Sequence, residues 1–161
     1  MKFFSWLPAA IAAAVLPACD GINLKELKPG VATVADVRQR MGPPSAEFRN
    51  DDGTLTYEYN RQPNGVDCFM LTFGLDQILQ RSEQVLNESQ FARISAGLSR
   101  DQVRRLLGKP GQVNVYRNSG EEVWDWRFAG GLPTEEWHFH VHFDQESGLV
   151  KRSSRRLEQR G

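Results

Sequence analysis

Several features that commonly mark an enzyme or an integral membrane protein are scarce in this chain of 161 residues. It has only two cysteines, so a scaffold held by several disulfides is excluded. All three histidines fall between positions 138 and 142, and no GxSxG nucleophile turn is present, so no catalytic Ser/His/Asp set is indicated. No apolar run reaches the roughly 20 residues that a membrane-spanning helix needs. We therefore expect neither an enzyme, nor a bound cofactor, nor a chain that crosses a bilayer.

An excess of charge of one sign is also lacking. The chain carries 20 basic and 20 acidic residues, and removal of residues 1–18 takes away Lys2 alone, which leaves a net charge of −1. Nucleic-acid binding is therefore not expected. Basic side chains gather only near the carboxyl end, where we interpret them as a solvated tail, with contact to anionic lipid headgroups as the alternative. These residues are Lys151, Arg152, Arg155, Arg156 and Arg160.

The amino-terminal residues carry the clearest functional signal. Lys2 precedes an apolar stretch over residues 3–15, and small residues follow, which is the layout of a signal peptide. The segment 16–19, with the sequence Leu-Pro-Ala-Cys, resembles the lipobox of bacterial lipoproteins. That resemblance implies cleavage after Ala18, a diacylglycerol on Cys19 and acylation of the new amino terminus. Several acyl chains anchor a protein stably, whereas a single chain binds marginally.

The cysteine count favours this lipoprotein interpretation over an ordinary secretory signal. If Cys19 is acylated, Cys68 has no disulfide partner in a compartment that would permit one. Cys68 lies in a strand-like run, so we expect it to be a small buried apolar residue. Asp20 follows the lipidated position, and in enteric bacteria that residue is associated with the inner membrane. The family resemblance described below favours the outer membrane, with the protein facing the periplasm.

One pattern occurs twice along the chain. Residues 29–44 align with residues 96–110, with one extra residue in the first copy, and the offset persists downstream, where 57–59 falls opposite 124–126. Such a repeat predicts two similar structural units in tandem. The chain then divides into a signal peptide (1–18), a first unit (19–86) and a second unit (87–161) with the basic tail.

Each copy predicts a short capped helix. Ser99 and Gln102 form the capping-box pattern, and Thr33 and Asp36 are a near variant of it. A glycine and then a proline end both helices. Strand-like runs follow each helix, so the predicted fold is α+β: two tandem ααβββ-type units, with short helices packed on an antiparallel sheet. Further short helices are expected at 22–27 and 89–94. Residues 48–59 and 113–128 are each expected to hold two strands around a turn, at 50–53 and 118–120 respectively. Further strands are expected at 68–73, 77–86, 137–143 and 149–154.

The second copy resembles a known family. The segment 92–110 is followed by a predicted strand that ends in Trp-Asp-Trp-Arg-Phe at 124–128. This combination resembles the SmpA/OmlA (BamE-like) family of bacterial outer-membrane lipoproteins, here as a tandem pair. The resemblance covers most of residues 22–154, although the first copy has Met41 and has Tyr in place of Trp. It implies a lipid-anchored, non-enzymatic binding or scaffold module in outer-membrane β-barrel protein assembly or envelope integrity. Tandem repeats of this type also resemble the β-lactamase inhibitory proteins, so an inhibitor that holds an enzyme on a concave sheet is the alternative.

The histidines form the one candidate metal site. His138, His140 and His142 alternate along a predicted strand, so all three point to one face. Imidazoles at that spacing can bind zinc or copper. The alternative is a solvated strand face opposite a buried one.

Two other groups of side chains have both a structural and a binding interpretation. Arg100, Arg104 and Arg105 are expected on the exposed side of the second helix, either simply solvated or forming a surface for a partner or for lipid headgroups. Trp124, Trp126 and Phe128 share one strand face, where core packing under the helix is the simpler interpretation and a binding platform the other.

Overall fold

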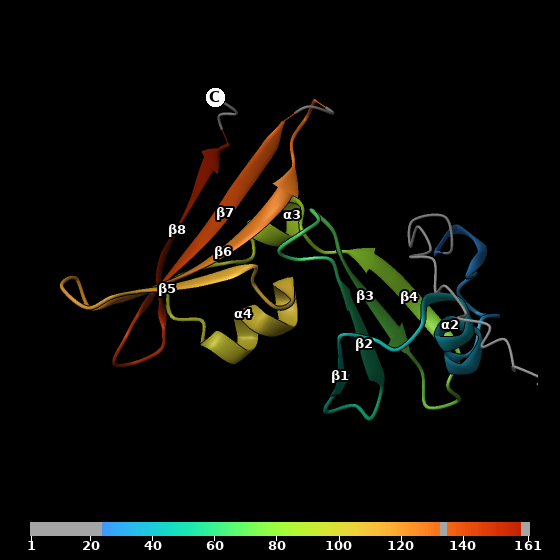
Figure 1. The fold of residues 1–161 in the computed structure, drawn as a ribbon. Helices are drawn as coiled ribbons and strands as arrows, with labels where there is room; N and C mark the ends of the chain where they lie inside the picture. The colour runs from blue at the N-terminus through green and yellow to red at the C-terminus, as the bar shows by residue number, and fades with distance from the viewer. Residues whose placement is uncertain (1–23, 133–134, 159–161) are drawn as a thin grey trace, which may run out of the picture.

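The protein is built from two four-stranded antiparallel sheets and a few short helices (Figure 1), which confirms the α+β class. The computed structural model describes residues 24–132 and 135–158, so Ala18 and Cys19 lie outside the described residues. None of the described helices has the length and apolar character needed to cross a bilayer. The helices are α2 (Val34–Met41), α3 (Glu88–Phe91) and α4 (Arg100–Leu107). The strands are β1 (Ala46–Arg49), β2 (Leu55–Asn60), β3 (Cys68–Phe73) and β4 (Leu79–Gln84), then β5 (Gln112–Tyr116), β6 (Glu121–Ala129), β7 (Glu136–Asp144) and β8 (Val150–Leu157).

The two principal helices begin with the same capping box. In α2 the Asp36 amide donates to the Thr33 hydroxyl over 3.2 Å, and the Thr33 amide donates to the Asp36 carboxylate over 2.8 Å. Ser99 and Gln102 repeat both contacts at the start of α4, again at 3.2 and 2.8 Å. The near variant in the first copy is therefore a complete capping box. Shorter helical segments precede both helices, at residues 24–26 and in α3.

Each sheet has four strands in sequence order, so the three-strand composition expected for each unit is not confirmed. The basic residues near the carboxyl end also differ from the expected tail. Residues 150–157 form β8, which pairs antiparallel with β7 along its length. Lys151, Arg152, Arg155 and Arg156 are thus side chains of an ordered edge strand, and Arg160 lies outside the described residues.

The layers alternate between helix and sheet (Figure 1). One face of the first sheet packs against α2 through a cluster that contains Val37, Tyr57 and Phe73. The other face carries Cys68 and Met70 into a second cluster together with α4 and the second sheet. α4 therefore lies between the two sheets. Because that cluster takes side chains from both halves of the chain, the two units share one core.

The aromatic residues of β6 belong to this shared core. Trp126 and Phe128 are buried, and the partly buried Trp124 packs against them. The Trp126 indole donates to the Gly108 carbonyl oxygen over 3.2 Å. Core packing is thus confirmed for these residues. Cys68 is a fully buried free thiol whose pKa is raised by burial, as expected for a small apolar residue.

Candidate metal centre on the second sheet

The face of the second sheet that points away from α4 carries polar side chains, and no described helix covers it (Figure 1). Alternation along β6 places Asp125 on this face, opposite the tryptophans on either side of it. The strand register sets Asp125 directly across from His140 and sets Arg127 across from His138. Asp125 therefore meets both histidines from the neighbouring strand.

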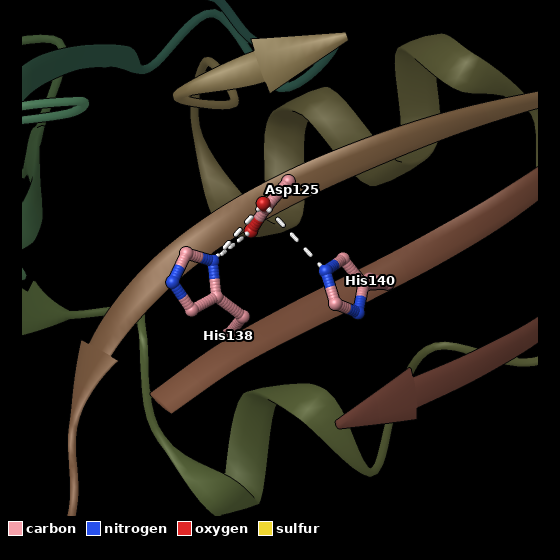
Figure 2. Close-up of side chains that lie close together, drawn as sticks. All are labelled: Asp125, His138 and His140. Atoms are coloured by element: carbon pink, nitrogen blue, oxygen red, sulfur yellow. Dashed lines mark hydrogen bonds and ion pairs between the residues drawn. The ribbon is translucent and has the colours of Figure 1, made fainter. Parts of the chain in front are cut away.

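Asp125, His138 and His140 lie together at this point (Figure 2). His138 Nδ1 is 2.8 Å from Asp125 Oδ1 and 3.0 Å from Oδ2, and His140 Nε2 is 3.6 Å from Oδ2. One ligand atom from each residue lies within 4.8 Å of the other two. This separation is compatible with a single metal ion bound by two imidazoles and one carboxylate.

His142 belongs to a different group of side chains. Its Nδ1 lies 3.3 Å from Glu121 Oε2, and its Nε2 lies 3.1 Å from the Ser154 hydroxyl. The centroid of its ring is 6.5 Å from that of His140. The structure thus brings together two of the three histidines, with Asp125 as the third neighbour in place of His142.

The histidine face is not a solvated strand face. The side chains of His138, His140 and His142 are only 11%, 18% and 12% exposed. Side chains of β5 and β8 and the loop after β2 lie around them. The alternation along β7 predicted the shared face correctly, but it could not show that neighbouring strands and a loop from the first unit would enclose it.

Burial and charge act in opposite directions on His140. Burial disfavours the imidazolium and lowers the pKa of His140 below its ordinary value, although the Asp125 carboxylate opposes this shift. The nearby His138, Arg156 and His142 lower it further. The shift favours the neutral imidazole, which is the form that binds a metal.

Two hollows adjoin this cluster. One opens beside His140 and is lined by residues that include Asn114, Tyr116 and Ser154. The other lies at the His138 end, where Gln62 and Glu158 contribute to its wall. Water and small ligands therefore have access to the cluster from the β5 side.

The arginines of α4 are engaged within the chain. Arg100 forms two 3.0 Å contacts with the Glu122 carboxylate, and Arg104 binds the buried carboxylate of Glu58. The side chain of Arg104 is only 21% exposed, whereas that of Arg105 is 45% exposed. The prediction of an exposed side chain is thus wrong for Arg104, because the first sheet covers that side of the helix. The same prediction is correct for Arg105, which pairs with Asp101 one turn earlier.

Asp125 was not among the residues that the sequence indicated as ligands. Its position between Trp124 and Trp126 predicts that it lies on the same side of the sheet as the histidines, because alternation places it on the face opposite the buried indoles. The pairing register that sets it opposite His140 depends on how β6 and β7 meet. The sequence pattern alone does not specify that register.

No family model and no curated protein matches the chain. Two solved structures are similar over most of its length. One is provisionally described as a beta-lactamase inhibitor protein from Streptococcus mutans, with 11% identity, coverage of 85% of this chain and 94% of that chain, and a TM-score of 0.32. The other is a DUF4309 family protein (YjgB) from Bacillus subtilis subsp. subtilis str. 168, with 14% identity, coverage of 83% and 82%, and a TM-score of 0.31. At such TM-scores neither similarity supports an argument about function, and the SmpA/OmlA resemblance stays a prediction.

Proposed function

We propose that this chain is a non-enzymatic binding lipoprotein of the bacterial cell envelope, anchored to the outer membrane through Cys19 and facing the periplasm. The observation that carries the proposal is the lipobox-like segment over residues 16–19, which follows a signal-peptide layout. The chain that follows forms an α+β domain, and no described helix of it could serve as an alternative anchor. Acylation at Cys19 would supply the membrane attachment.

The uncovered face of the second sheet is the surface that we propose for partner binding. The first sheet packs on α2 with one face and towards α4 with the other, and the second sheet uses its other face for the shared core. The remaining face combines charged residues with aromatic and amide side chains, among them Glu121, Tyr116 and Asn114. Mixed surfaces of this kind are typical of specific protein interfaces. In line with the family resemblance, we propose a component of outer-membrane protein assembly as the partner.

The anchor is tested by mass spectrometry of the mature amino terminus, together with separation of inner and outer membranes. We expect a triacylated Cys19 in the outer-membrane fraction of the wild type and release of the Cys19→Ala variant from it. An unmodified terminus in the soluble periplasm would refute the lipoprotein proposal. Acylated protein in the inner membrane would refute the proposed location and would agree with a sorting role for Asp20.

The binding face is tested by site-specific photo-crosslinking in cells. A crosslinking amino acid at Asn114, exposed on β5, is expected to capture a barrel-assembly subunit. The matched control is Leu75, which is 79% exposed and lies in the turn between β3 and β4, away from this face. Equal capture from both positions would contradict the proposed face. Capture of a periplasmic enzyme from Asn114 without assembly subunits would favour an inhibitor instead.

A further inference from the structure

We propose that Asp125, His138 and His140 bind one zinc-type divalent ion on the open face of the second sheet. The inference is independent of the lipid anchor, because it rests only on side chains of β6 and β7. It also differs from a site made of the three histidines, since His142 is engaged with Glu121 and Ser154.

Two of the three ligand separations are close to those of a tetrahedral ion. With metal-to-ligand distances of about 2.0–2.1 Å, the ligand atoms of a tetrahedral zinc site lie about 3.3 Å apart. Asp125 Oδ2 is 3.0 Å from His138 Nδ1 and 3.6 Å from His140 Nε2, which brackets that value. All three residues lie on paired strands, so the backbone already holds them at this spacing. The third separation, between the two imidazoles, is bounded only by the 4.8 Å that contains one ligand atom of each residue, so binding would draw the two rings together around the ion.

The second nitrogen of His138 is compatible with the same arrangement. His138 is 9% exposed, and its Nε2 has no hydrogen-bond partner among the described residues. In the tautomer whose Nδ1–H donates to Asp125, Nε2 would be a buried lone pair without a donor, which is an unfavourable state. If Nδ1 binds a metal instead, the proton moves to Nε2, which lies 3.9 Å from the Glu158 carboxylate. A histidine bound to a metal commonly donates its other N–H to such a carboxylate.

Charge balance supports the same assignment. The Asp125 carboxylate is buried and lies between two imidazoles. A buried carboxylate is costly without a compensating positive charge. The nearby Arg127 binds Glu136 and lies 3.8 Å from Glu158, so its charge is shared with other carboxylates. A divalent ion between Asp125 and the two imidazoles would place positive charge directly beside the carboxylate.

The ligand set selects the metal class. Two imidazole nitrogens and one carboxylate oxygen suit zinc and neighbouring transition metals, whereas calcium and magnesium prefer sites made of oxygen atoms. The hollow beside His140 leaves the fourth position open to water. A site with three protein ligands and an open position can also accept a donor atom from a bound partner.

The test is isothermal titration of Zn²⁺ into the full chain carrying Cys19→Ala, which leaves the buried Cys68 as the one remaining thiol. We expect one ion per chain with a dissociation constant of about 1 µM or tighter. His140→Gln and the isosteric Asp125→Asn are each expected to weaken binding by at least about tenfold, which is the smallest loss usual even for outer-shell partners.

The matched control is His142→Gln, on the same strand and the same face, which should bind zinc within about twofold of the parent chain, well below the loss expected for a ligand. Circular dichroism of each variant shows whether it is folded, and a loss of binding counts only in a folded variant. Binding of Co²⁺ should give a visible tetrahedral spectrum without a thiolate charge-transfer band, which excludes Cys68 as a ligand. The proposal is overturned if the parent chain takes up no zinc at about 100 µM, or if His142→Gln weakens binding as much as both ligand variants do.

Discussion

His140 illustrates how strongly a single side chain depends on its cross-strand neighbours. On its own strand it looks like one of three equivalent histidines, yet only His138 and His140 contact Asp125, which lies on β6. Its pKa is lowered by burial, against the attraction of that carboxylate. The residue therefore couples the stability of the sheet to pH.

We expect His140 to make the protein less stable as the pH falls through the range near 6.5. Because the folded form lowers the pKa of His140, the unfolded chain binds the proton more readily, with an ordinary pKa of about 6.5. Stability from this group is thus complete above that value and declines as the pH falls towards the lower folded pKa. Denaturant unfolding at about pH 7.5 and about pH 5, in metal-free buffer, should show a smaller loss for His140→Gln than for the wild type. Equal losses in the two proteins would contradict the shift.

At the scale of elements, α2 and α4 have the same ends but different surroundings. Both end at a glycine with positive φ, 78° at Gly42 and 79° at Gly108. A methyl group added at Gly42 would meet nothing within 4 Å, whereas one at Gly108 would lie 2.4 Å from Cys68 Sγ. The difference arises because the end of α4 packs against β3 of the first sheet.

This contrast predicts unequal effects of the same substitution. Gly42→Ala and Gly108→Ala should each cost about 1–3 kcal/mol for a backbone conformation that L residues avoid. Gly108→Ala should cost about 1–3 kcal/mol more, because the added methyl group overlaps the Cys68 sulfur. Urea unfolding of both variants measures the two losses.

The control for that overlap is Cys68→Ala, which removes the sulfur. In the Cys68→Ala background, most of the difference between the two glycine substitutions should disappear, and the 3.2 Å approach of the added methyl group to Glu58 Oε1 accounts for the remainder. Equal losses in the wild-type background would show that α4 does not end tightly against β3.

At the scale of the whole molecule, a buried polar contact joins the two units. Glu58 on β2 is fully buried, and its carboxylate accepts from Arg104 on α4 and from the Lys109 amide at 3.0 Å. The Gln62 side chain pairs with the backbone of Arg127 on β6 through contacts of 2.7 and 3.0 Å. Together with the shared apolar cluster, these contacts make the two sheets one folding unit.

We therefore expect Arg104→Ala to destabilise the entire protein by about 3 kcal/mol or more, since removal of one partner leaves a buried charge uncompensated. Guanidinium unfolding of the chain without residues 1–18 should show one transition, with the same midpoint by two probes. Tryptophan fluorescence then reports on Trp124, Trp126 and Trp137 of the second unit, and far-ultraviolet circular dichroism reports on both units. Two separated transitions would mean that the units fold independently.

Arg105→Ala is the matched control. Arg105 lies next to Arg104 on α4, but its partner Asp101 is largely exposed, so its loss should cost well under about 1 kcal/mol. A similar loss in the two variants would show that Glu58 does not depend on Arg104.

The local features of this protein were determined by its sequence. Capping residues and terminal glycines specified where α2 and α4 begin and end, because these contacts join residues three or four positions apart. The alternation of Trp124, Asp125 and Trp126 correctly separated the buried from the open face of β6.

Only the tertiary structure decided what lies against those faces. A helix packed on one sheet exposes its other side, which predicts an exposed Arg104, but the first sheet covers that side of α4 and places Glu58 against Arg104. Likewise, the register between β6 and β7 placed Asp125 between two histidines and left His142 to Glu121. Such contacts join residues far apart in the chain, and they depend on how whole sheets pack. Local patterns do not encode that packing.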